Sequence, residues 1–177
     1  MSQAQGFSTE RLVIRRFTED DAAGLLDVLG DAEVMRFSDH GPLDAVAVSS
    51  WLGEQIAAYA ACPELGRWAI CRRGDAAVIG YIGLTRAAGR TAEGEAELGF
   101  RLARSRWGKG YASEAARAVL RRAFARTRIE HVIAIVDPHN QGSVRVLEKL
   151  GLSFLRTVTF EGYDHPDHVY GLGRPGA

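Results

Sequence analysis

A short segment bracketed by glycines constrains this chain more than any other part of its sequence. Residues 106–114 read Arg-Trp-Gly-Lys-Gly-Tyr-Ala-Ser-Glu, and from Ala112 to Phe124 small and apolar side chains recur at three- and four-residue steps. That spacing predicts an amphipathic helix with one buried face. Glycine allows backbone conformations that other side chains block, and the first turn of a helix leaves N–H groups unpaired. The segment therefore predicts an anion-binding loop of the kind that holds phosphates.

Residues 106–114 do not match two better-known phosphate-binding motifs. A P-loop needs Ser or Thr after its lysine, and a dinucleotide-binding fingerprint needs a third glycine or an alanine where Ser113 stands. The local charge still suits an anionic ligand, because residues 101–128 hold nine basic side chains and one acidic side chain, Glu114. We interpret Glu114 as a favourable partner of the helix dipole in the first turn.

The composition bounds the remaining interpretation. The chain has 177 residues, of which 46% are hydrophobic, so we expect a single domain over residues 1–177 with its own core. A formal net charge of zero argues against a general nucleic-acid binder. No apolar run approaches the length of a membrane span, and residues 1–6 lack a signal pattern. We therefore expect a cytoplasmic protein without a membrane partner.

The order of the predicted elements indicates an α/β fold. Helices are expected to carry residues 25–29, 48–59, 112–124 and 144–150, and strands are expected near residues 11–17, 67–72, 77–84, 93–102, 131–136, 152–159 and 168–172. The strand, glycine loop, helix and strand from residue 93 to residue 136 form a predicted βαβ unit. Gly151 stands where a left-handed helix cap belongs, and the last two strands are expected to pair as antiparallel neighbours.

Several separated motifs together resemble a known superfamily. Trp107-Gly108-Lys109-Gly110-Tyr111-Ala112, followed after a strand by Asn140 and then by Leu150-Gly151-Leu152, is similar to the GNAT superfamily of acetyl-coenzyme A (acetyl-CoA) dependent N-acetyltransferases. Thr9-Glu10-Arg11-Leu12 and the segment from Ser143 to Gly151 resemble its ribosomal-protein N-acetyltransferase (Rim) branch. One departure is Trp107, which stands where many members place Gln or Arg; the backbone donors of the loop are unaffected.

The resemblance implies a fold, a reaction and a cosubstrate. The fold would be a mixed, centrally splayed β-sheet flanked by about four helices. The reaction would transfer acetyl from acetyl-CoA to a primary amine, either a protein N-terminus or a small amine, without a metal. It also allows a homodimer, because related proteins often dimerise. The alternative is a catalytically silent CoA-binding or interaction module of the same fold.

The resemblance also assigns coenzyme contacts. The N–H groups from Gly108 to Ser113 would hold the diphosphate, Leu102 and Ala103 would run beside pantetheine, and Asn140 would bond to it. The full set of cofactor-binding candidates is Leu102, Ala103, Trp107, Gly108, Lys109, Gly110, Tyr111, Ala112, Ser113 and Asn140. For three of them a structural role is the alternative: Asn140 as a helix N-cap, Lys109 as a solvated lysine, and Ser113 as a cap residue.

Attack of an amine on a thioester needs a base for the ammonium proton and benefits from an acid for the leaving thiolate. Many superfamily members supply the acid from a Tyr seven residues after the Asn, but that position here is Leu147. The Rim-type pattern substitutes Ser143, whose alternative role is to satisfy helix backbone groups; Tyr170 is a weaker donor. Glu97 matches an acidic position of the branch and is the candidate base, with a solvated strand acid as the alternative.

A group of acids and histidines near the end of the chain invites a metal interpretation. The group comprises Asp164, His165, Asp167 and His168, with Pro166 among them. Its spacing matches no zinc pattern. We therefore interpret it as a polar loop before the last strand.

Overall fold

The computed structural model describes residues 6–86, 89–161 and 165–176. Its strands and α-helices are β1 (Gly6–Ser8), β2 (Leu12–Arg15), α1 (Ala22–Leu29), α2 (Ala45–Ala58), β3 (Gly66–Arg72), β4 (Val78–Thr85), β5 (Glu95–Leu102), α3 (Tyr111–Arg126), β6 (His131–Val136), α4 (Gln141–Lys149), β7 (Ser153–Val158) and β8 (Asp167–Gly173). The predicted α/β order is confirmed. The strand β1, only three residues long, was not predicted.

The eight strands form one sheet in the order β1-β2-β3-β4-β5-β6-β8-β7. Every neighbouring pair is antiparallel except β5 and β6, which are parallel and are joined through α3. The predicted βαβ unit and the predicted antiparallel pairing of β7 with β8 are therefore confirmed. Gly151 has a φ of 86° directly after α4, as a left-handed cap requires.

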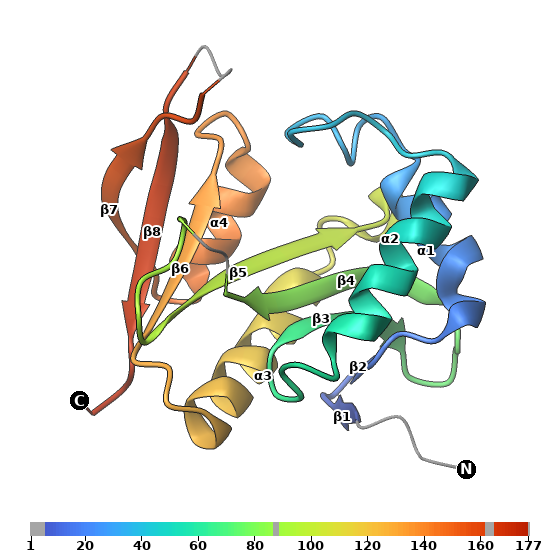
Figure 1. Cartoon of the computed structure of the whole chain (residues 1–177), viewed down its shortest axis with the longest axis horizontal. Coiled ribbons are helices and arrows are strands. Elements are labelled where there is room, and N and C mark those ends of the chain that lie inside the picture. Colours follow the sequence, from blue (N-terminus) through green and yellow to red (C-terminus); the bar gives the residue numbers. More distant parts are fainter. Residues whose placement is uncertain (1–5, 87–88, 162–164, 177) are drawn as a thin grey trace.

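The sheet opens at its centre. The strands β5 and β6 pair only from Glu95 with His131 to Glu97 with Ile133. Beyond that point β5 stays paired with β4 as far as Leu102, while β6 stays paired with β8, and the two strands separate, as Figure 1 shows. The facing edges of residues 98–102 and 134–136 are left without a strand partner, and such an edge can bond an extended ligand. The prediction of a centrally splayed sheet is confirmed.

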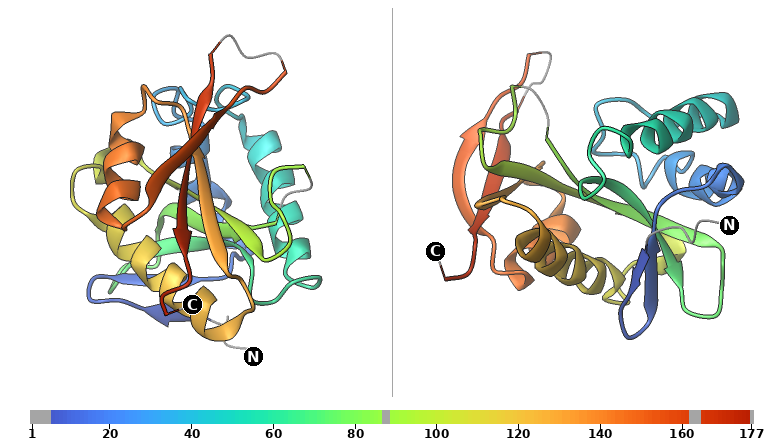
Figure 2. Two further views of the ribbon diagram at one scale, coloured as in Figure 1. Left: turned by 90° about the vertical axis from the view of Figure 1, so that its left-hand side faces the viewer. Right: turned by 60° about the horizontal axis from the view of Figure 1, so that its bottom comes forward.

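Helices cover both faces of the sheet (Figure 2). The helices α1 and α2 pack together on one face, and α3 and α4 contact each other on the opposite face. The predicted stripe of α3 is buried, with Ala115, Ala116 and Val119 each at most 1% exposed, while Arg117 and Arg121 are exposed. This packing fixes the direction of α3 and so places its N-terminus at the open end of the sheet. No helix of the described segments has the length and apolarity that crossing a membrane requires.

Candidate active site

The loop between β5 and α3 leaves a row of backbone donors unused. Gly108 has a φ of 71° and Gly110 a φ of 79°, both in the left-handed region that favours glycine. The N–H of Glu114 donates to the carbonyl of Gly110 at 3.0 Å and so closes the first turn of α3. Within the described residues, no N–H group from Gly108 to Ser113 donates to a protein acceptor. These six unused donors lie at the positive end of the helix dipole, a position suited to binding an anion.

Three hydrogen bonds stabilise the loop and its junction with the sheet. Trp107 donates its indole Nε1–H to the carbonyl of Leu102 at 2.8 Å, although 47% of the residue is exposed. Lys109 donates its ammonium group to the carbonyl of Ser105 at 2.9 Å. The N–H of Ala103 donates to the carbonyl of Ile79 on β4 at 2.9 Å. The polar groups of Trp107 and Lys109 therefore stabilise the loop itself. The ammonium of Lys109 is bonded within the loop and is not simply solvated.

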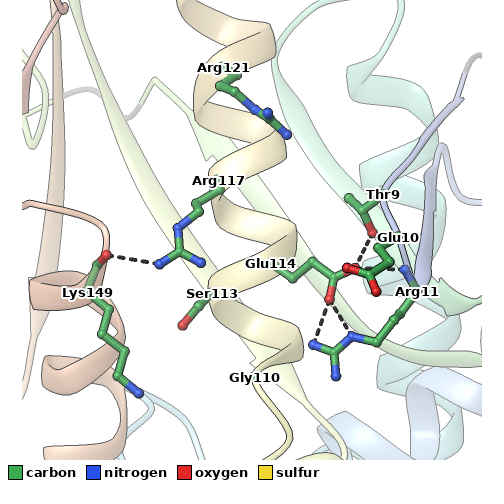
Figure 3. Close-up of a pocket in the computed structure, with 9 residues that line it drawn as sticks. All are labelled: Thr9, Glu10, Arg11, Gly110, Ser113, Glu114, Arg117, Arg121 and Lys149. Carbon is green, nitrogen blue, oxygen red and sulfur yellow. Dashed lines mark hydrogen bonds and ion pairs between the residues drawn. The ribbon is translucent and has the colours of Figure 1, made fainter.

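A cavity of about 530 Å³ opens beside the first turns of α3, between the β1–β2 turn and the end of α4 (Figure 3). Its lining comprises Thr9, Glu10, Arg11, Gly110, Ser113, Glu114, Arg117, Arg121 and Lys149. Arg117 donates to the carbonyl of Lys149 at 3.2 Å. Within the described part of the chain, the side chains of Arg117, Arg121 and Lys149 form no ion pair. These uncompensated cations make the cavity attractive to a polyanion.

Glu114 is bound by the N-terminal segment, which the sequence interpretation did not anticipate. Its Oε1 accepts from the Thr9 hydroxyl at 2.5 Å and from the Arg11 N–H at 2.9 Å, and its Oε2 accepts from Arg11 Nε at 2.7 Å. Burial by itself would raise the pKa of Glu114, but these hydrogen bonds and the Arg11 charge together lower that pKa below its ordinary value. The carboxylate is therefore charged and fully engaged at neutral pH. The only sequence feature that could have indicated this contact is the motif Thr9-Glu10-Arg11. It lies too far from Glu114 in the sequence for the contact to be predicted.

Asn140 caps α4 at the open end of β6. Its Oδ1 accepts from the Ser143 N–H at 3.1 Å, which confirms the N-cap role considered for it. That bond uses only the carbonyl end of the amide, and in the described segments the amide N–H₂ has no acceptor. A cap role and a ligand contact are therefore compatible. Ser143 is half-buried in the first turn, and Leu147, one turn further, is 2% exposed in the core.

Glu97 lies in a bidentate ion pair. Arg90 donates from Nε to Oε2 at 2.9 Å and from Nη2 to Oε1 at 2.7 Å, and the Arg90 guanidinium stacks 5.0 Å from the ring centroid of Phe160. Glu97 shares a strand face with Arg101, whose Nη1 lies 3.3 Å from Met35 Sδ in the α1–α2 connection. Glu97 therefore faces the helical layer opposite α3, and both of its oxygens already accept hydrogen bonds.

Comparison with known proteins decides the family. Residues 11–153 match the family model described as the acetyltransferase (GNAT) domain. The chain belongs to the GNAT acetyltransferase family. The uncharacterized N-acetyltransferase p20 of Bacillus licheniformis is 30% identical over 156 residues, which cover 88% of this chain and 85% of p20.

Solved GNAT structures match the whole architecture. The structure of a GNAT-family acetyltransferase from Bacillus anthracis superimposes with a TM-score of 0.84 at 25% identity, covering 96% of this chain and 99% of that one. A ribosomal-protein-S5-alanine acetyltransferase from Vibrio fischeri, at 14% identity, superimposes with a TM-score of 0.80, covering 97% of this chain and 98% of that one, and shows the shared fold alone.

Membership of the GNAT family makes this protein an N-acetyltransferase, and acetyl-CoA is the acetyl donor of the family. The residues present fit that donor. The loop offers unused N–H groups for a diphosphate, the separated strands offer unpaired backbone edges, and the adjoining cavity offers uncompensated cations.

The remaining candidates lie apart from the glycine loop. Tyr170 is 7% exposed and packs against Phe154 and His168. Asp164 lies outside the described residues. His165 lies 3.5 Å from Asp137 and 3.9 Å from Asp167, measured between nitrogen and carboxylate oxygen. Burial and the neighbouring Asp137 charge raise the pKa of Asp167. In the part of the chain that the structure describes, no group of three or more His, Cys, Asp or Glu is arranged to hold a metal ion.

Proposed function

We propose that this GNAT enzyme acetylates a primary amine, either a protein N-terminus or a small-molecule amine, by direct attack of that amine on the thioester of acetyl-CoA. One observation carries the proposal above the others. The unused N–H groups of residues 108–113 lie where the separated strands β5 and β6 end, so a diphosphate and an extended arm can be bound together.

The coenzyme contacts follow from this arrangement. The N–H groups from Gly108 to Ser113 bind the diphosphate, including those of Lys109, Tyr111 and Ala112. Leu102 and Ala103, at the end of β5, run beside the pantetheine arm, and the free N–H₂ of Asn140 donates to it. Trp107 acts indirectly, through its bond to the carbonyl of Leu102.

The outlying phosphate of the coenzyme adds a third contact region. Arg117, Arg121 and Lys149 line the cavity that adjoins the loop and have no carboxylate partners in the described segments. We assign this cavity to the phosphate-bearing nucleotide end, because a phosphate is attracted most strongly where positive charge is uncompensated.

Acetyl-CoA supplies an acetyl group activated as a thioester. The acceptor nitrogen forms a bond to the carbonyl carbon, the carbon–sulfur bond breaks, the ammonium proton leaves, and the sulfur takes up a proton. Glu97 takes the ammonium proton and Ser143 donates to the sulfur. Both Glu97 oxygens are bound by Arg90, so the incoming cationic amine must first displace that guanidinium.

The same ion pair favours the second candidate, a catalytically silent CoA-binding module, because both oxygens of the candidate base already accept hydrogen bonds from Arg90. One experiment separates the two. Purified protein is incubated with acetyl-CoA and a panel of N-terminal peptides, polyamines and aminoglycosides, and free thiol is measured. Acceptor-dependent thiol release supports the enzyme. Tight CoA binding by calorimetry without release above the no-acceptor rate, across the whole panel, would support the silent module.

A further inference from the structure

Arg11 links the N-terminal segment to the phosphate-binding loop. We infer that Arg11 is a positioning residue, which holds residues 108–113 in the conformation that presents their N–H groups to an anion. The inference rests on the proposed function in one respect, that the anion is the diphosphate of CoA. None of the coenzyme contacts described above includes Arg11.

One guanidinium group contacts both sides of Gly110. Arg11 Nη1 donates to the carbonyl of Lys109 at 3.0 Å. The Arg11 Cζ lies 4.7 Å from the ring centroid of Tyr111, and Nη2 lies 2.6 Å from Oε2 of Glu114. Together these contacts span the loop from the residue before Gly110 to the first turn of α3, and the planar guanidinium of arginine, with donors on three nitrogens, is well suited to such a role.

The bond to Lys109 sets the direction of a donor. The carbonyl of Lys109 and the N–H of Gly110 belong to one planar trans peptide unit, so they point in opposite directions. Holding the carbonyl toward Arg11 therefore turns the N–H of Gly110 away from Arg11, toward the open side of the loop. Without that bond Gly110, with a φ of 79°, leaves this peptide freer to rotate than another residue would.

Arg11 is already charge-paired, which favours positioning over direct phosphate binding. Each of its three guanidinium nitrogens has an acceptor, on Lys109 or Glu114. The Glu114 carboxylate also compensates its positive charge. Arg11 therefore contributes little net attraction to a phosphate, whereas Arg121 in the same cavity has no such partner among the described residues.

The test uses Arg11→Ala and Arg11→Lys, with Arg16→Ala as a matched control. Arg16 lies in the same N-terminal segment, stacks 4.8 Å from the ring centroid of Tyr59 and donates to the carbonyl of Pro63 at 3.1 Å. Away from the loop it thus makes two of the same kinds of contact, one with an aromatic ring and one with a backbone carbonyl. Hydrogen exchange of peptides covering residues 104–114 is measured without ligand, and CoA affinity is measured by calorimetry at low and moderate salt.

We expect faster exchange across the loop in both Arg11 variants and unchanged loop exchange in Arg16→Ala. If the competent loop population falls to about one tenth, the dissociation constant for CoA rises about tenfold. The lysine variant is not expected to recover the affinity, because an ammonium cannot make all three contacts at once. The salt dependence of binding is expected to stay parallel to that of the parent.

Unchanged loop exchange in both Arg11 variants overturns the inference, whatever happens to stability. Recovery of parental affinity by Arg11→Lys, with a flattened salt dependence in Arg11→Ala, overturns it in favour of a direct phosphate ligand. If Arg11→Ala does not fold, Arg11→Lys decides by the same two measurements. If the parent protein binds no CoA, the proposed coenzyme site fails, while loop exchange still shows whether Arg11 holds the loop.

Discussion

Replacing Gly110 tests the anion loop most directly. Gly110→Asp adds a side chain at a φ of 79° and a negative charge where the diphosphate approaches. An ideal Cβ there would lie 3.4 Å from Arg11 Nη2, the mobile end of a side chain, so the fold should persist. The left-handed backbone should cost about 1 kcal/mol, or a fall in melting temperature of about 2–4 °C for a domain of this size.

The effect on binding should be much larger than the effect on stability. Two unit charges 4 Å apart interact by about 1 kcal/mol in bulk water and about 4 kcal/mol near a protein surface. One such repulsion therefore weakens CoA binding by about 5-fold to about 1,000-fold. The charge should also draw Arg11 away from Lys109 and Glu114, which adds to the loss.

Two controls isolate these effects. Gly110→Asn has nearly the same shape and tolerates left-handed backbone, so its difference from Gly110→Asp reports the charge alone. Gly74→Asp carries the same strain, because Gly74 also has a φ of 79° and nothing lies within 4 Å of an added Cβ. We expect similar melting temperatures for both aspartate variants and impaired CoA binding, by calorimetry, only at position 110. Equal CoA affinity of Gly110→Asp and the parent would refute the assignment of this loop.

Three further predictions concern catalysis, charge and pH. Glu97→Gln and Ser143→Ala should each lower turnover by about 100- to 10,000-fold with nearly unchanged CoA affinity. Raising the pH should partly rescue only Glu97→Gln, because a higher pH supplies free amine. A Glu97→Gln rate within about threefold of the parent, far short of that range, would remove Glu97 from the mechanism. CoA affinity should fall with added salt, and Arg121→Gln should flatten that dependence, whereas Arg128→Gln, outside the cavity, should not. If calorimetry at two ionic strengths shows the same salt dependence of CoA affinity for both variants, the cavity assignment is contradicted. Because the pKa of Glu114 in the folded protein lies below its ordinary value of 4.5, Glu114 stabilises the fold above about pH 4.5, and this stabilisation is lost as the pH falls through the folded pKa. Glu114→Gln should therefore weaken the acid dependence of the urea midpoint. An unchanged dependence would count against this ion pair.

Features with a local cause could be predicted from the sequence. The three- and four-residue spacing from Ala112 to Phe124 predicted α3 and its buried face, because that spacing places the side chains on one side of a helix. Gly151 was predicted to adopt left-handed backbone and does so; Gly108 and Gly110, predicted to allow backbone conformations that other residues block, also adopt it. The central opening of the sheet followed from the family resemblance, since no periodicity indicates that two paired strands will separate.

The site was only partly predictable. Glu97 was proposed as a base because it matches an acidic position of the Rim branch, but its partner Arg90 comes from a connecting loop whose path no local pattern determines. Lys109 carries a charge in an anion-binding loop, yet its ammonium bonds to Ser105 within that loop. For Asn140 the cap role and the coenzyme role looked like alternatives, whereas the structure shows that the two ends of one amide can serve both.

The sequence by itself determined the helices, most of the strands and the glycine conformations, because each depends on interactions within a few residues. The tertiary structure alone decided which distant side chains meet these elements. Arg11 and Glu114 are 103 residues apart, and they come together because α3 packs against β2 and the β1–β2 turn lies beside its first turn. An ion pair of this kind has no local signal, since its geometry depends on strand order and helix packing across the whole molecule.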